Sequence, residues 1–179
     1  LVQTLHGQLI RIASNSAQHI NPMDIAIDEY LFQNPMEVIA NKSDFLISLC
    51  EIIVGGRYGL SSEERSVIDK CVQRIYKNFI ENSPNIAKMP LLSNLQNELK
   101  KEGEVALRVS NSLEMFVNGS QNLFNHHTNI DLSNRLICFD IKELGNQLKK
   151  VGMLIVQDTV WNRVSVNRNQ KKITRYYID

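Results

Sequence analysis

The spacing of apolar residues changes twice along this chain of 179 residues. Residues 8–13 alternate between polar and apolar side chains enough to predict a strand. Between residues 43 and 118 the apolar residues recur every three or four positions, which is the period of an α-helix. Residues 136–139 form a continuous apolar run, typical of a strand that is buried on both faces. The chain is therefore expected to begin as α/β, to become all-helical, and to return to α/β.

Four helices are expected in the middle of the chain. Ser43 is placed to cap the first helix, and Gly55 would stop it. Ser61 and Glu64 form a capping box at the start of the second helix. Pro90 suits the first turn of the third, and a fourth follows after a short connection. Helices of this length joined by short loops predict a small bundle.

The last part of the chain is expected to contain a helix between two strands. Residues 144–163 have helical spacing, and residues 172–178 look like a closing strand. A strand, a crossover helix and a second strand form the parallel unit of open α/β sheets. We therefore predict an α/β nucleotide-binding domain, with residues 1–35 and 131–179 as its two parts and residues 36–130 as an all-α insertion.

Composition excludes some classes of protein. The 20 basic and 19 acidic residues leave a net charge of +1, so total charge gives no reason to expect attraction to nucleic acid or membranes. No apolar run approaches the roughly 18 residues that a membrane span needs. Cys50, Cys71 and Cys138 are far apart in apolar surroundings, which predicts buried free thiols rather than a metal site.

Asp179 follows the predicted closing strand, which gives it the form of a Walker B aspartate. In that arrangement a buried strand delivers a carboxylate to the Mg²⁺ of a bound nucleotide, because Mg²⁺ prefers oxygen ligands. A strand-end aspartate that caps the next turn has the same local sequence. Both interpretations remain open for Asp179.

Two further residues are candidates for the site. Asp140 follows the predicted strand at 136–139, and ligands gather at the carboxyl ends of such strands. It could equally cap the helix that follows. Arg163 lies beyond Trp161, where it could stabilise phosphate charge in a neighbouring subunit of a ring ATPase or belong to a solvated helix end.

Two other motifs favour structural roles. The glycines of residues 55–59 follow a predicted helix, and no Gly-Lys-Ser/Thr sequence is present, so they indicate a helix stop rather than a phosphate loop. His126 and His127 are adjacent, and adjacent side chains point in different directions on regular structure, which argues against a shared metal ion.

Several stretches together resemble a known family. They are residues 20–24, 127–131, 135–144, 161–163 and 176–179. In this order and at about this spacing, they are similar to the C-terminal domain of the large conjugation ATPase of type IV secretion systems. This is the VirB/TraE-like family, which is related to the HerA and FtsK DNA-pumping ATPases.

The resemblance implies a RecA-like P-loop ATPase core interrupted by an all-α region, with ATP and Mg²⁺ as cofactors. Asp179 matches the Walker B aspartate, and Asp140 falls in the family's intermediate motif. The Walker A lysine would lie upstream of Leu1 and the catalytic glutamate just beyond Asp179, so this piece alone is expected neither to hydrolyse ATP nor to bind it tightly.

The resemblance also implies partners and a location. The parent protein is expected to form homo-oligomers, often hexamers, at the cytoplasmic face of the cell membrane, held there by other type IV secretion components. DNA is a further candidate partner. Two alternatives remain: residues 36–119 could be a non-enzymatic helical module that docks onto secretion-channel or DNA-processing proteins, or the parent could be a DNA translocase of the coupling-protein type.

Overall fold

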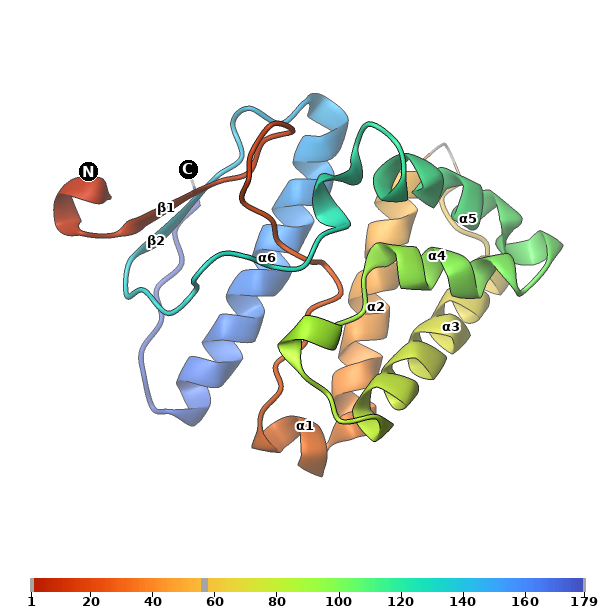
Figure 1. Cartoon of the computed structure of the whole chain (residues 1–179), viewed down its shortest axis with the longest axis horizontal. Coiled ribbons are helices and arrows are strands. Elements are labelled where there is room, and N and C mark those ends of the chain that lie inside the picture. Colours follow the sequence, from red (N-terminus) through yellow and green to blue (C-terminus); the bar gives the residue numbers. More distant parts are fainter. Residues whose placement is uncertain (1, 56–57, 179) are drawn as a thin grey trace.

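The computed structural model describes residues 2–55 and 58–178, apart from the side chains of Gln3 and Gln147. Within them the chain forms six α-helices and two β-strands (Figure 1). The elements in order are β1 (Gln8–Arg11), α1 (Glu29–Gln33), α2 (Pro35–Val54), α3 (Ser62–Glu81), α4 (Leu92–Lys100), α5 (Glu104–Val117), β2 (Ile137–Asp140) and α6 (Asn146–Asn169). Three short 3-10 helices cover Gln3–Leu5, Ile86–Lys88 and Asn122–Phe124.

Helices α2 to α5 pack on one another and form the helical part of the molecule (Figure 1). Their apolar faces meet in a shared core that includes Leu46, Leu49, Ile68, Val72, Leu95, Val109 and Leu113. Burial of such faces supplies most of the stability of amphipathic helices. The predicted four-helix bundle is therefore present.

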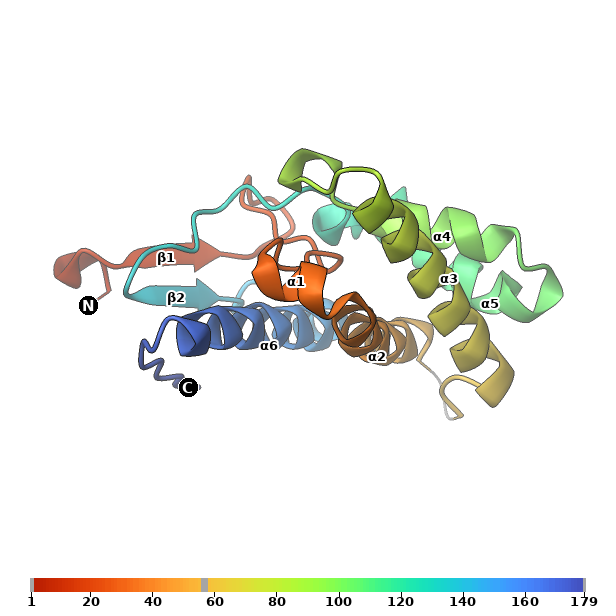
Figure 2. The same cartoon turned by 90° about the horizontal axis from the view of Figure 1, so that it is seen from below.

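Strands β1 and β2 form a parallel pair at the other end of the molecule, with Gln8 opposite Ile137 and Arg11 opposite Asp140. The helical part lies in the connection between them. Helix α6 runs below the level of the strands in Figure 2 and reaches the helical part, where it contacts α2. The described residues are thus mainly helical, and the expected α/β character rests on this small parallel sheet and the helix after it.

Helix α2 begins eight residues before the predicted cap at Ser43. Pro35 occupies the first turn, where its missing N–H is not needed. Ser43 lies inside the helix, and its hydroxyl donates to Asp69 Oδ1 of α3 at 2.6 Å. A polar side chain mid-helix was mistaken for a helix start because its partner, 26 residues away, is invisible locally.

The other helix predictions are close to the structure. The capping box of Ser61 and Glu64 is present at the start of α3. Gly55 ends α2 with φ +59°, a conformation that glycine adopts without strain. Helix α4 begins at Leu92, two residues after Pro90.

The prediction of a closing strand at residues 172–178 is wrong in this structure. The segment follows a turn at Lys171 and pairs with no strand in the described part of the chain. Its side chains are exposed, with Ile173 89% and Tyr177 82% accessible. A strand requires a neighbour for its N–H and C=O groups, and apolar residues alone cannot supply one. Asp179 lies outside the described residues.

Strand β2 also differs from expectation, since it is half-buried rather than buried on both faces. It is paired with β1 and, among the residues described, with no further strand.

Across those same residues, no helix has both the length and the apolar character to cross a membrane.

Candidate functional site

The carboxyl ends of β1 and β2 bring Arg11 and Asp140 together. Arg11 Nε lies 3.9 Å from Asp140 Oδ2, and the Lys142 N–H donates to Asp140 Oδ1 at 3.0 Å. Asp140 thus lies at the edge of a parallel sheet where ligands gather, and its binding role stays a prediction. The expectation that it caps the next helix is wrong, because α6 begins only at Asn146 with Gly145 as its N-cap, and Asp140 instead caps the turn that comes before it.

A shallow depression lies beside this edge. Its lining consists of Leu9, Arg11, Asn15, Ser16, Gln18 and Glu143. The Ser16 hydroxyl donates to the Arg11 carbonyl at 2.8 Å, and Gln18 Oε1 accepts from the Arg11 N–H at 2.7 Å. These side chains therefore hold the backbone beyond β1, while the Arg11 guanidinium remains the one basic group of this lining.

Arg163 is not brought to this edge. It lies 17 residues after Asn146, which is about 25 Å along α6 at roughly 1.5 Å per residue. There it is half-buried near Asp131. Hydrogen bonds from Ser133 are the main cause that lowers the pKa of Asp131, and the charge of Arg163 adds to them. The structure thus separates Asp140 from Arg163.

The histidines and cysteines form no metal site in the described part of the chain, where no group of three or more His, Cys, Asp or Glu side chains could hold an ion. The ring of His126 instead stacks on His19, with centroids 4.3 Å apart. Cys50 and Cys71 are buried free thiols as predicted, and burial raises the pKa of both. Cys138 is free and half-buried.

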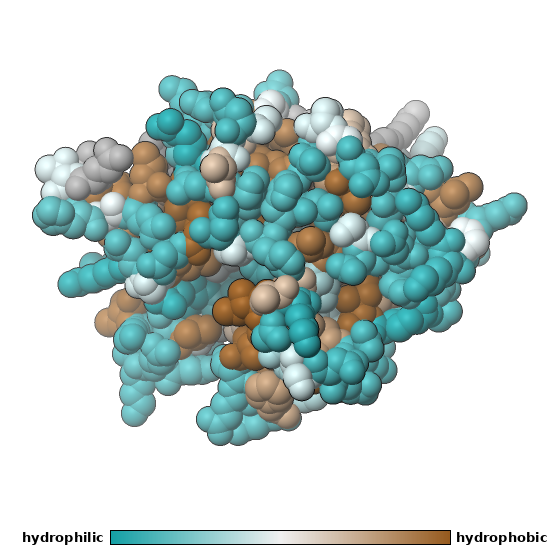
Figure 3. All heavy atoms as spheres, in the orientation of Figure 1, coloured by the Kyte–Doolittle hydropathy of each residue, from teal (hydrophilic) through white to brown (hydrophobic). Residues whose placement is uncertain are grey.

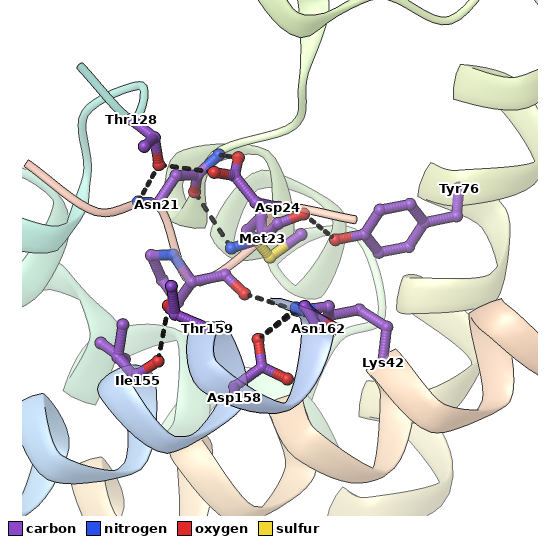
Figure 4. A network of polar contacts seen from close by, with 11 residues as sticks. Asn21, Met23, Asp24, Lys42, Tyr76, Thr128, Ile155, Asp158, Thr159 and Asn162 are labelled. Carbon is purple, nitrogen blue, oxygen red and sulfur yellow. Dashed lines mark hydrogen bonds and ion pairs between the residues drawn. The ribbon is translucent and has the colours of Figure 1, made fainter. Parts of the chain in front are cut away.

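A polar cluster that the sequence analysis did not predict surrounds the segment Asn21–Asp24 (Figure 4). The Asn21 side chain accepts from the Met23 N–H at 3.0 Å and donates to Asp24 Oδ1 and the Pro90 carbonyl, both at 2.8 Å. The Tyr76 hydroxyl of α3 donates to the Met23 carbonyl at 2.5 Å. The segment is therefore held without belonging to a helix or strand.

Lys42 of α2 is the buried cation of this cluster, with a side chain only 4% exposed. Its Nζ donates to Asp158 Oδ2 of α6 at 2.8 Å and to the Pro22 carbonyl at 3.2 Å (Figure 4). It also lies 4.6 Å from the centre of the Phe45 ring. One ammonium group thus joins α2, α6 and the segment between β1 and α1.

A sequence signal for Lys42 exists. Ile39, Lys42 and Leu46 share one face of α2, and Ile39 and Leu46 are core residues. A lysine at the helical period of a buried face requires a partner, because an unpaired buried charge is costly. That the partner is Asp158, 116 residues later, could not be predicted from spacing.

Asp24 is the half-buried carboxyl group of the cluster. Burial raises its pKa, and hydrogen bonds from Thr128 and Asn21 together with the charge of Lys42 oppose that rise. The Thr128 hydroxyl donates to Asp24 Oδ2 at 2.5 Å. Since the polar groups of Asp24 and Lys42 are engaged by protein atoms, this arrangement holds chain segments together rather than offering a reactive group.

Comparison with known proteins identifies a structural relative. No protein-family model matches the chain, and no curated protein sequence matches it. The fold is similar to that of a solved structure, VirB4 of Thermoanaerobacter pseudethanolicus, with a TM-score of 0.73 and 20% sequence identity. The match covers 93% of this chain and 65% of that one, so the chain spans about two-thirds of its relative's length. At this identity the likeness shows a shared fold.

Proposed function

We propose that this chain is part of an ATPase of the VirB/TraE-like family that powers conjugative DNA transfer, type IV secretion or assembly of the secretion channel. The observation that carries the proposal is the similarity of fold to VirB4 over 93% of the chain. The stretches of sequence that resemble the same family support it independently.

In this proposal, residues 1–35 and 131–179 belong to a RecA-like core and residues 36–130 are inserted into it. The parallel pairing of β1 with β2 supports this division, because the two strands are adjacent although the helical part lies between them in sequence. A parallel neighbour reached through a long helical connection is typical of open α/β sheets.

ATP and Mg²⁺ would be cofactors of the longer protein. We assign Asp179 the role of a Mg²⁺-linked Walker B aspartate, Asp140 a place at the nucleotide edge, and Arg163 a role toward a neighbouring subunit. The residues present do not suffice to hold a nucleotide, because the chain has no GxxxxGK[ST] sequence. The Asp140 carboxylate accepts from the Lys142 N–H through Oδ1, and its Oδ2 lies 3.9 Å from Arg11 Nε.

The longer protein would act as a homo-oligomer such as a hexamer. It would work at the cytoplasmic face of the cell membrane together with other type IV secretion components, and DNA is a candidate ligand. These assignments follow from the proposed family.

An ATP hydrolysis assay tests the proposal. The purified chain of 179 residues should show no Mg²⁺-dependent turnover, because it lacks a phosphate loop. A chain extended in both directions along its source gene should contain that loop upstream and an acidic residue directly after Asp179, and it should hydrolyse ATP. Turnover by the short chain, or a source gene without a phosphate loop, would contradict the proposal.

A second candidate is a docking module formed by the helical part. Leu107 and Met115 of α5 favour it, since these apolar side chains are 52% and 41% exposed and lie eight residues apart on one helix face. Deleting the helices from the longer protein separates the candidates. Loss of partner binding with preserved ATP hydrolysis supports docking, and loss of hydrolysis supports a structural part of the ATPase. Stimulation of hydrolysis by DNA would instead favour a coupling-protein type of translocase.

A further inference from the structure

The second half of α6 lies on the surface of the molecule. The buried residues of this helix all lie in its first half, the last of them being Val156, and none of the described residues 157–178 is buried. Two views place the C-terminal end of the helix away from α3–α5 (Figures 1 and 2). This part of α6 is therefore accessible to solvent and to a partner.

One face of this exposed half carries an aromatic ring and a positive charge. Trp161, Ser165 and Arg168 follow one another at four and three residues, so they share a face of the helix, and all three are exposed. Trp161 and Arg168 are about 10 Å apart along the helix axis, at roughly 1.5 Å per residue. Trp161 is 64% exposed, which favours a binding surface, because aromatic side chains gain most from being covered.

Two lysines continue the positive charge beyond the helix. The chain turns at Lys171, whose φ is +56°, and the Lys172 N–H donates to the Asn167 carbonyl at 2.8 Å. The Asn167 side chain donates to Thr174 Oγ1 at 2.8 Å. The two lysines thus belong to a hydrogen-bonded turn at the end of α6. We call Trp161, Arg168, Lys171 and Lys172 together the α6 surface.

The positive charge of this region is local. Residues 159–178 contain five basic residues and no acidic one, whereas the whole chain has a net charge of only +1. One of the five, Arg163, is half-buried near Asp131 and lies outside the α6 surface. The three basic residues of the α6 surface are exposed, and none of them forms an ion pair with a described residue. Their charges are therefore available to an anionic partner.

The helix dipole explains only part of this arrangement. Basic residues near the C-terminal end of a helix complement the negative end of its dipole. The dipole gives no reason for an exposed tryptophan on the same face, about two turns earlier. A single strand of nucleic acid fits both features, because its phosphates attract cations and its bases stack on aromatic rings.

An anionic membrane fits the α6 surface less well. Helices that lie in a membrane surface combine basic residues with a broad apolar face. Trp161 instead stands alone among Ser165, Arg168 and Asn169 on the exposed side of the helix. Charge and a single stacking ring, without a broad apolar face, favour nucleic acid.

We propose that the α6 surface binds single-stranded nucleic acid, with its three cations on the phosphates and Trp161 stacked on a base. This goes beyond the proposed function, which names DNA only as a candidate ligand and assigns no residue to it. The inference rests on the charge and exposure of these four residues. Its test involves no ATP hydrolysis, so either proposal can fail while the other stands.

Trp161 is the only tryptophan of the chain, so its fluorescence reports directly on this surface. Titration of the 179-residue chain with single-stranded oligothymidylate at low salt should quench the fluorescence of Trp161. Three phosphate contacts predict a slope of about −2 for the logarithm of the association constant against the logarithm of the salt concentration. No quenching, together with no change in the fluorescence anisotropy of a labelled oligothymidylate, would overturn the proposal.

Two double variants of equal net charge locate the binding. Arg168→Gln with Lys172→Gln should weaken binding by roughly tenfold and bring the salt slope to about −0.7. Lys149→Gln with Lys150→Gln is the matched control, because these two lysines are exposed at the other end of α6. The control should bind within about twofold of the unchanged chain. Equal weakening by both double variants would show a diffuse attraction to the whole chain and would contradict the α6 surface.

A third variant tests the stacking. Trp161→Leu should weaken binding by roughly tenfold, as measured by the anisotropy of a labelled oligothymidylate, because it removes the ring. A strand with abasic sites in place of the thymidines has the same backbone charge, and it should bind the unchanged chain as weakly as oligothymidylate binds the variant. Unchanged binding by Trp161→Leu, or equal binding of the abasic strand and oligothymidylate to the unchanged chain, would show that no base stacks on Trp161.

Vesicles that contain phosphatidylserine test the other anionic partner. A blue shift of Trp161 fluorescence on these vesicles, without binding of oligothymidylate, would assign the α6 surface to a membrane and overturn the proposal. All of the substituted side chains are exposed, so the variants should fold, and circular dichroism checks that they do.

Discussion

At the scale of single residues, Lys42 best illustrates how this molecule is held together. Its ammonium group lies in a helix face that is otherwise apolar, and it is accepted there because Asp158 and the Pro22 carbonyl surround it. Desolvation of the pair cancels much of its attraction, so the pair adds little net stability compared with apolar residues of similar size. Removal of one partner alone should destabilise the fold, because the remaining charge is then largely buried and has no partner of opposite charge.

Lys42→Met should therefore destabilise the chain strongly, by about 3–5 kcal/mol, since Asp158 loses its cation. Urea denaturation followed by circular dichroism measures the free energy of unfolding. Lys70→Met is the matched control, because the Lys70 side chain is exposed and its partner Glu102 keeps an ion pair with Arg74, so the loss should be less than about 1 kcal/mol. The double variant Lys42→Met with Asp158→Leu should recover much of the loss. Equal effects of the two lysine substitutions would show that Lys42 is not a buried charge in solution.

At the scale of elements, the Glu64 carboxylate both caps the start of α3 and binds α5. Glu64 accepts from the Ser61 N–H at 2.7 Å, which closes the capping box, and from Arg108 Nε of α5 at 2.8 Å. The hydrogen bond from Arg108 is the main cause that lowers the pKa of Glu64 from its ordinary value of 4.5 to about 2. A local helix cap thus becomes a contact between helices.

This depressed pKa predicts a loss of stability in acid. Folded Glu64 binds a proton less readily than unfolded Glu64, so its contribution is complete above pH 4.5 and disappears as the pH falls to about 2. Arg108→Met should flatten the dependence of the unfolding free energy on pH in that window, because it removes the main cause of the shift. The raised pKa of Asp24 changes the stability in acid in the opposite direction, but it is present both in Arg108→Met and in the unchanged chain, so it does not affect the comparison.

Denaturant titrations at several pH values between 2 and 6 provide the measurement. Lys100→Met serves as the control, since the Lys100–Glu114 pair is exposed on both sides and should leave the acid dependence nearly unchanged. The same acid dependence in Arg108→Met and in the unchanged chain would contradict the role of Arg108.

At the scale of the whole molecule, apolar residues near the end of the chain face solvent. Ile173, Tyr177 and Ile178 are exposed, and so is Trp161 of α6. Figure 3 shows that hydrophobic residues, in brown, also lie among the hydrophilic ones on the face seen in Figure 1. The tail is tied back by the Asn167 side chain, which donates to Thr174 Oγ1 at 2.8 Å. Exposed apolar segments of this kind commonly belong to contacts with further protein.

A chain that ends at Lys171 should therefore be nearly as stable as the chain of 179 residues, within about 0.5 kcal/mol, because the side chains of residues 172–178 are exposed. Thermal and urea unfolding of both chains measure the difference. A large loss of stability would instead indicate that residues 172–178 pair with the sheet in solution, as the sequence analysis expected.

Features of the fold could be predicted from the sequence where the residues that define them lie close together along the chain. The capping box of Ser61 and Glu64, the stop at Gly55 and strand β1 were predicted, because the groups that define them lie within a few residues. The start of α2 was misplaced, because Ser43 bonds Asp69 across two helices. The polar cluster and the contact between residues 17–24 and 123–129 were missed, since Lys42–Asp158 and His19–Asn129 join residues more than 100 positions apart.

The sequence by itself determined the succession of a strand, a helical bundle, a second strand and a long helix, because hydrophobic period and capping are local properties. Only the tertiary structure decided which strands pair, which buried charges meet and whether a strand-like segment enters a sheet. Residues 172–178 have the composition of a strand, yet they lie exposed in the described structure. A strand exists only when a neighbour accepts its hydrogen bonds, and that neighbour is chosen by the fold.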